Sequence, residues 1–140
     1  MKVLLGVGNE LRADEGCGSL LARWFKADGW VSIDGGTAPE NFIGKIKKMN
    51  PDLVVIVDSA DMGLEPGEVR IIPKEKIANY TITTHSMPLS MLMENFKRCI
   101  LIGIQPKKIE FSEMSPEVKM AVERLMEILK SDKLNEISQL

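Results

Sequence analysis

A chain of 140 residues with 44% hydrophobic and 27% charged side chains has the size and composition of one globular domain with its own core. The net charge of −2 argues against the broad basic surface that binds nucleic acid or an anionic membrane. Two cysteines cannot build a disulfide scaffold, and no apolar run reaches the ~20 residues of a membrane span. No exposed apolar stripe is visible. We therefore expect a soluble cytoplasmic monomer that binds neither nucleic acid nor membrane.

Short apolar runs alternate with helix-period segments, which is typical of a largely parallel sheet covered by helices. In the first half of the chain, apolar strands are predicted at 3–7, 31–34 and 53–57. A helix with Asp14 as its N-cap follows the first strand, and a second helix begins at Pro39 and ends before Asn50. One apolar face of the first helix is formed by Cys17, Leu20, Leu21, Trp24 and Phe25.

In the second half, strands are predicted at 69–72 and 100–104, and helices at 88–96 and from Ser115 onward. The connection between strands 53–57 and 69–72 is too short for a helix, so we expect this pair to be antiparallel. Residues 81–86 are polar and irregular, and residues 131–140 are expected to form a frayed tail. The sequence thus predicts a single domain over 1–140. Its fold is a three-layer α/β/α arrangement around a twisted, mostly parallel five-stranded sheet with one antiparallel strand.

Carboxylates follow the predicted strands at the edge where open α/β sheets bind their ligands, outside the carboxyl ends of the parallel strands. Glu15 lies in the segment after the first strand, and Asp34 and Asp58 come at the ends of the next two parallel strands. A buried carboxylate is costly, and functional residues concentrate on loops that rigid strands position. These three residues therefore define the candidate site.

His85 is the only histidine, which excludes a three-histidine zinc site and the HExxH motif. The sequence also lacks a GxSxG nucleophile elbow. By itself, a lone histidine in a polar segment is more often a surface or capping residue. Together with Glu15 and Asp58, however, His85 would complete an O,O,N ligand set suited to a divalent transition ion such as nickel.

Two other patterns have simpler structural interpretations. Gly6 and Gly8 begin like a dinucleotide-binding fingerprint, but Leu11 stands where the third glycine is needed, so the fingerprint fails. Gly8 is instead expected to permit a tight turn. Cys17 lies on the apolar face of the first helix and Cys99 lies beside the last strand, so both are interpreted as buried, unreactive thiols.

Five blocks of sequence, taken together, resemble the hydrogenase maturation endopeptidase family in the order in which that family has them. The blocks are Gly6–Gly18 (GVGNELRADEGCG), Asp34–Glu40 (DGGTAPE), Val57–Gly63 (VDSADMG), Thr84–Ser86 (THS) and Gly103–Pro106 (GIQP). Each block alone is a weak signal, whereas the combination is highly specific and extends over about Met1 to Glu127. The TAPEN wording is similar to the branch that serves hydrogenase 3.

The resemblance implies an endopeptidase that removes the C-terminal extension of a nickel-loaded [NiFe]-hydrogenase large-subunit precursor. It implies that Glu15, Asp58 and His85 contact the nickel and that Asp34 is functionally important. The nickel belongs to the substrate, so the free enzyme is expected to hold it weakly or not at all. Asp34 or Asp58 would help to position the attacking water, and the sequence does not choose between them as the base.

Two other functions compete with this interpretation. A non-catalytic nickel-handling or scaffold protein would use the same three ligands to bind a metal-loaded partner, and precursor cleavage distinguishes it. A nucleotide-binding α/β module is the second, and the failed glycine spacing counts against it.

For the endopeptidase, Glu15, Asp58 and His85 are expected on surface loops, where substitutions change stability little.

Overall fold

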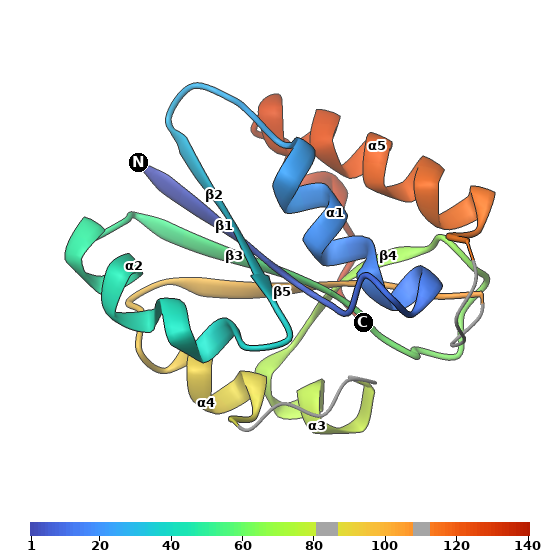
Figure 1. Cartoon of the computed structure of the whole chain (residues 1–140), viewed down its shortest axis with the longest axis horizontal. Helices are drawn as coiled ribbons and strands as arrows, with labels where there is room; N and C mark the ends of the chain where they lie inside the picture. Colours follow the sequence, from blue (N-terminus) through green and yellow to red (C-terminus); the bar gives the residue numbers. More distant parts are fainter. Residues whose placement is uncertain (81–86, 108–112) are drawn as a thin grey trace.

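The computed structural model describes residues 1–80, 87–107 and 113–140. Within these residues, one five-stranded sheet has the strand order β2-β1-β3-β5-β4. Strands β2, β1, β3 and β5 run parallel, and β4 is antiparallel to β5. This arrangement confirms the predicted mostly parallel sheet with one antiparallel strand (Figure 1). The strands are β1 Lys2–Val7, β2 Trp30–Gly36, β3 Leu53–Ser59, β4 Val69–Ile72 and β5 Cys99–Ile104.

The antiparallel partner of β4 is β5, so the expected pairing of β4 with β3 is wrong. β5 occupies that edge of β3, with Val54 opposite Cys99 and Ser59 opposite Ile104. The chain after β3 crosses the carboxyl end of β5 before it turns back as β4. Backbone bonds from Ala60 N to the Ile104 carbonyl and from Gly67 N to the Gln105 carbonyl hold this crossing. A short connection therefore reverses the chain direction without making the two strands neighbours.

Helices cover both faces of the sheet and form the two outer layers (Figure 1). One face packs against α1 (Cys17–Trp24) and α5 (Pro116–Lys130), and the other against α2 (Ile43–Met49), α3 (Ile77–Tyr80) and α4 (Leu89–Met93). None of the helices in the described part of the chain has both the length and the apolar character that crossing a membrane requires. Short 3₁₀ helices complete the chain: η1 Ala13–Gly16, η2 Pro39–Phe42, η3 Lys74–Lys76 and η4 Leu134–Glu136.

The central strand β3 explains why its sequence is continuously apolar. Every residue of β3 is buried, because helices lie on both of its faces. Val55 and Val57 belong to the core under α1 and α5, whereas Val54 and Ile56 belong to the core under α2 and α4. This alternation assigns a face to each side chain at the ends of the strands.

The region around α1 differs from the prediction. The helix begins at Cys17, and Asp14 lies in the preceding 3₁₀ turn η1, where it caps neither element with its side chain. Trp24, expected on the apolar face, is 54% exposed. The helix ends at Trp24, and Phe25 beyond it is the aromatic residue that enters the core, edge-to-face with Trp30 at 5.4 Å between ring centroids.

The C-terminal residues 131–140 are not a frayed tail. Ile71 N donates to the Ser138 carbonyl, and Leu140 N donates to the Ile71 carbonyl, so the end of the chain pairs with β4. Ile137 is buried in the core beneath α5. The exposed edge of β4 is thereby covered by the chain's own last residues, a common way to protect an edge strand.

Candidate active site

Glu15 reaches the carboxyl edge of the sheet on a loop that folds back over the end of β1. Three backbone bonds close this loop: Asn9 N to the Glu15 carbonyl, Arg12 N to the Asn9 carbonyl and Glu15 N to the Arg12 carbonyl. Ala13 has φ of 48°, in the left-handed region, which costs a residue with a Cβ roughly 1–2 kcal/mol. The loop is thus held in one conformation even where that conformation is strained.

Glycines allow the loop and the first turn of α1 to lie directly on the strands. A Cβ on Gly18 would lie 2.2 Å from the Val57 carbonyl oxygen and 2.3 Å from that of Val7. A Cβ on Gly8 would lie 2.1 Å from the Glu15 carbonyl oxygen, and one on Gly6 equally close to that of Gly18. Close backbone packing, and not a bound pyrophosphate, therefore explains the glycines after the first strand.

Glu15 and Asp58 are both buried, with exposed fractions of 2% and 0%. The expected surface location is therefore wrong for these two residues, because η1, which carries Glu15, packs against β3, whose residues are all buried. The Glu15 Oε2 atom lies 3.2 Å from Arg12 Nε, and it accepts no hydrogen bond from the described residues. The Asp58 Oδ1 atom accepts a hydrogen bond from Ser59 N at 2.8 Å.

The environments of the two cysteine thiols raise the pKa of both. Burial raises the pKa of Cys17 well above its usual value, and the carboxylates of Asp58 and Asp14 raise it further. Burial likewise raises the pKa of Cys99, to about 12. Cys17 is buried as predicted, whereas Cys99 is only partly buried. Neither thiol is activated, and the negative charges of Asp58 and Asp14 disfavour the thiolate of Cys17 at the start of α1.

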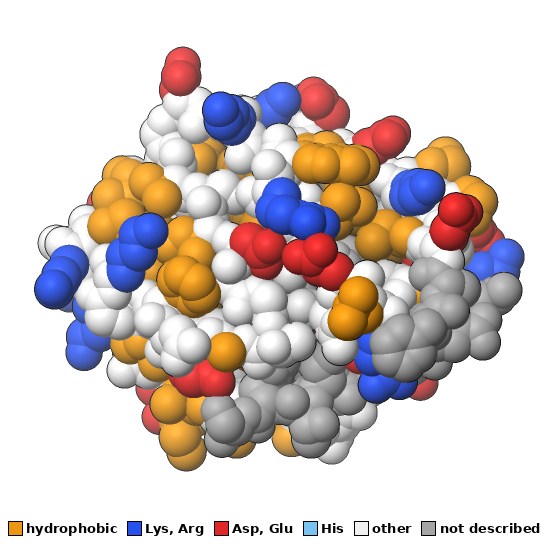
Figure 2. All heavy atoms as spheres, viewed as in Figure 1, with side chains coloured by type: hydrophobic (Ala, Val, Ile, Leu, Met, Phe, Trp, Pro, Cys, Tyr) orange, Lys and Arg blue, Asp and Glu red, His pale blue; other side chains and the backbone are white. Residues whose placement is uncertain are grey.

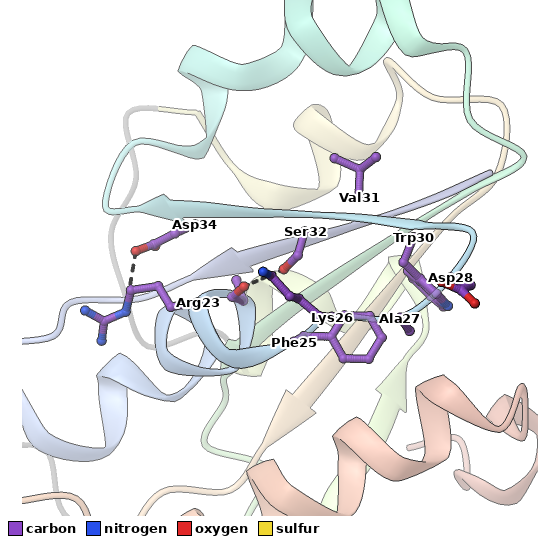
Figure 3. A pocket seen from close by; sticks show the side chains of 10 residues that line it. Arg23, Phe25, Lys26, Ala27, Asp28, Trp30, Val31, Ser32 and Asp34 are labelled. Carbon is purple, nitrogen blue, oxygen red and sulfur yellow. Dashed lines mark hydrogen bonds and ion pairs between the residues drawn. The ribbon is translucent and has the colours of Figure 1, made fainter.

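Asp34 lies at the same edge of the sheet but on another face. It is aligned with Gly6 of β1, which is aligned with Val57 of β3. Side chains alternate along a strand, so Asp34 faces α1 like Val57, whereas Asp58 projects to the opposite face. Figure 3 shows Asp34 and Ser32 on the side of β2 that faces α1, with Val31 on the other side. Asp34 and Asp58 therefore project to opposite faces at the carboxyl edge, and Glu15 lies in η1, which packs against β3.

Asp34 is held in position and remains partly accessible. Its Oδ1 atom accepts a hydrogen bond from Gly36 N at 3.0 Å, and its Oδ2 atom lies 3.9 Å from Arg23 Nε (Figure 3). Its side chain is 29% exposed. An open pocket of ≈ 720 Å³ between α1 and β2 extends to Asp34 and Arg23. A carboxylate that is both oriented and open to solvent can bind a water molecule at this pocket.

Asp14 has a role that the sequence did not reveal. Its carboxylate is fully buried and accepts hydrogen bonds from Lys107 N at 2.8 Å, Ser115 N at 2.7 Å and Ser115 Oγ at 2.8 Å. These bonds join the Glu15 loop to residues on both sides of segment 108–112, just before α5. The sequence signal was the position of Asp14 next to Glu15, but its partners lie about a hundred residues away.

Gln105 is a second residue whose role emerges only in the structure. Its Oε1 atom accepts hydrogen bonds from Met62 N at 2.7 Å and Leu64 N at 3.3 Å, and its Nε2 atom donates to Asp61 Oδ1 at 3.2 Å. The side chain thereby fixes the loop that follows Asp58. Gln105 stands in Gly103–Pro106, the last of the sequence blocks that carry the family resemblance. That block therefore positions the loop that follows Asp58.

The predicted histidine, His85, lies outside the described residues. In the described part of the chain, no three histidine, cysteine, aspartate or glutamate side chains are grouped as a metal site. The donor chemistry of Glu15 and Asp58 nevertheless suits a divalent cation, because one buried carboxylate oxygen of Glu15 accepts no hydrogen bond from the described residues. Over the face in Figure 2, acidic and basic side chains are interspersed, without a broad area of one charge.

The fold is an α/β domain with carboxylates at the carboxyl edge of a parallel sheet, the edge at which domains of this class bind their ligands. No activated thiol accompanies them in the described structure. Comparison with known proteins specifies the class. The sequence profile of the hydrogenase maturation proteases matches residues 16–132, and the chain belongs to this family of peptidases.

Individual relatives agree with the family assignment. The chain is 45% identical over 136 residues to the hydrogenase 3 maturation protease of Escherichia coli, covering 91% of this chain and 87% of that protein. The solution structure of an Escherichia coli endopeptidase superposes with a TM-score of 0.90 at 40% identity, covering 100% of this chain and 96% of the other. A [NiFe] hydrogenase maturation protease from Thermococcus kodakarensis superposes with a TM-score of 0.79 at 33% identity, covering 94% of this chain and 91% of the other. The family resemblance noted in the sequence is confirmed.

Proposed function

We propose that this peptidase removes the C-terminal extension of a [NiFe]-hydrogenase large-subunit precursor, of the hydrogenase 3 type, after nickel has been inserted. Glu15, Asp58 and His85 recognise the nickel, which arrives as part of the substrate. The free enzyme holds it weakly or not at all. The protein acts as a cytoplasmic monomer. The name of the 45% identical relative supports the hydrogenase 3 assignment.

The observation that supports this proposal is that Glu15 and Asp58 are both buried at the carboxyl edge of the sheet. Two carboxylates taken out of water in one region repel each other and favour a cation between them. Oxygen and imidazole ligands from three separate segments form an incomplete shell, which substrate groups have to complete. A precursor without nickel leaves the two negative charges uncompensated and therefore binds less well.

Asp34 is our candidate for handling the attacking water. Peptide hydrolysis adds water to the carbonyl carbon and delivers a proton to the departing amine, so a carboxylate that accepts and returns that proton assists both steps. Asp34 is the more accessible of the two candidate bases, and its bonds to Gly36 and its proximity to Arg23 orient it. Asp58 is buried and is assigned to the nickel.

Cleavage of the cognate precursor by isosteric variants tests this division of roles. Glu15→Gln and Asp58→Asn keep the buried volume, so they are preferred to alanine at these two positions. Both are expected to raise the KM for nickel-loaded precursor. Asp34→Asn is expected to lower kcat with a smaller effect on KM. Cleavage at the wild-type rate by folded Glu15→Gln and Asp58→Asn variants would remove the nickel-recognition role.

A further inference from the structure

Arg12 pairs with the very carboxylate that is proposed to contact nickel. Its Nε atom lies 3.2 Å from Glu15 Oε2, and the two residues stand one turn apart in a loop closed by its own backbone bonds. Glu15 is 2% exposed, so its charge would be costly to bury without a nearby cation. In the free enzyme, the Arg12 guanidinium provides that positive charge.

The geometry of this ion pair allows it to open. The two atoms are within ion-pair distance, but Glu15 Oε2 accepts no hydrogen bond from the described residues, so the pair lacks the directed geometry of the strongest arginine–carboxylate contacts. The Arg12 side chain is 41% exposed. Its Nε atom is buried beside Glu15, and the loop backbone fixes Glu15 independently of the Arg12 side chain.

We infer that Arg12 is a specificity-determining residue that occupies the Glu15 carboxylate until nickel displaces it. This inference rests on the proposed nickel contact of Glu15. A free cation has to displace the guanidinium and to remain beside a positive charge, so the free enzyme binds free nickel weakly. Nickel already bound to a precursor arrives with the additional contacts of that protein. Those contacts supply the free energy needed to move Arg12 aside.

The inference gives Arg12 a function that differs from stabilisation of the loop. An arginine that only supports the fold would affect nickel binding through stability, whatever its charge. An arginine that competes with nickel acts through its charge, so lysine should substitute for it and an uncharged side chain of similar length should not. Competition between two ligands for one site has the same effect on the affinity of each.

Calorimetric titration of the metal-free enzyme with nickel chloride tests the inference without precursor. Arg12→Met is expected to bind nickel at least about fivefold more tightly than wild type, and Arg12→Lys is expected to remain near wild type. Arg70→Ala is the matched control, because Arg70 pairs with Glu68 at the same 3.2 Å but on β4. Glu15→Gln in the Arg12→Met background should abolish the gain. Thermal unfolding of each variant verifies the fold.

Equal affinity in wild type and Arg12→Met, or no binding by Arg12→Met up to millimolar nickel, overturns the inference. A gain of the same size in Arg12→Lys also overturns it, because the charge would then be irrelevant. Cleavage that depends on nickel in the precursor, measured on the same preparations, separates this failure from failure of the proposed function. If cleavage stays nickel-dependent while Arg12→Met has no effect, only the role of Arg12 is lost.

Discussion

Replacing Asp14 by alanine should destabilise the protein strongly, although Asp14 is not among the proposed nickel contacts. The substitution leaves the buried Ser115 N–H and the partly buried Lys107 N–H without their acceptor. A buried donor without a partner costs about 1–3 kcal/mol, and the partly buried Lys107 donor costs less than the Ser115 donor, so the two together predict a loss of about 2–4 kcal/mol. That is a large part of the 5–15 kcal/mol of a typical domain. Asp14→Asn keeps one acceptor oxygen and should lose about half as much.

Equilibrium urea unfolding followed by tryptophan fluorescence measures this loss, provided that the m-value is unchanged. Asp52→Ala is the control, because Asp52 is an exposed aspartate whose carboxylate contacts the N-terminal amine, and its midpoint should barely move. Processing by Asp14→Asn should fall together with stability, since the same bonds hold the Glu15 loop. A loss below about 1 kcal/mol for Asp14→Ala would refute the assignment of these hydrogen bonds as a main support of the loop.

Three further predictions follow from packing and from the thiols. Burial raises the pKa of Cys99 from 9.0 to about 12, which lowers its thiolate fraction at about pH 8 roughly a thousandfold. Alkylation of Cys99 should therefore be slow and should accelerate as the pH rises. Rapid inactivation of the enzyme by iodoacetamide would contradict this prediction. Ile137→Ala should lower the free energy of unfolding by about 2 kcal/mol, whereas a frayed tail would show no change. Gly18→Ala should prevent folding or lower the free energy of unfolding by about 3 kcal/mol. Gly44→Ala is the control in α2, where a Cβ meets nothing within 4 Å, and it should leave that free energy unchanged or raise it.

The sheet and the edge carboxylates could be predicted because they depend on local sequence. A strand buried on both faces has to be continuously apolar, as β3 is, and a polar residue at its end, such as Asp58, marks the edge of the sheet. The start of α5 was equally local. Ser115 caps it by accepting a hydrogen bond from Val118 N, and Pro116 occupies the first turn.

The features that sequence could not predict depend on contacts between distant segments. Asp14 looked like an N-cap because a capping carboxylate accepts hydrogen bonds from backbone N–H groups only a few residues later in the chain. Its actual donors belong to Lys107 and Ser115. The C-terminal tail looked frayed because it is polar, yet its backbone pairs with β4, and backbone bonds leave no mark in composition. Burial of Glu15 likewise depends on η1 folding over the sheet, a tertiary effect.

We propose that nickel in the precursor is a condition for cleavage, and one experiment tests this most directly. One preparation of the cognate precursor is divided into a nickel-free and a nickel-loaded half, and metal-depleted enzyme is added to each. Release of the C-terminal extension is measured by mass spectrometry over time. Release is expected in the loaded half alone, and Glu15→Gln is expected to slow it. Equal release in both halves would contradict the account, and Glu15, Asp34 and Asp58 would then have to act as acid and base groups without a metal.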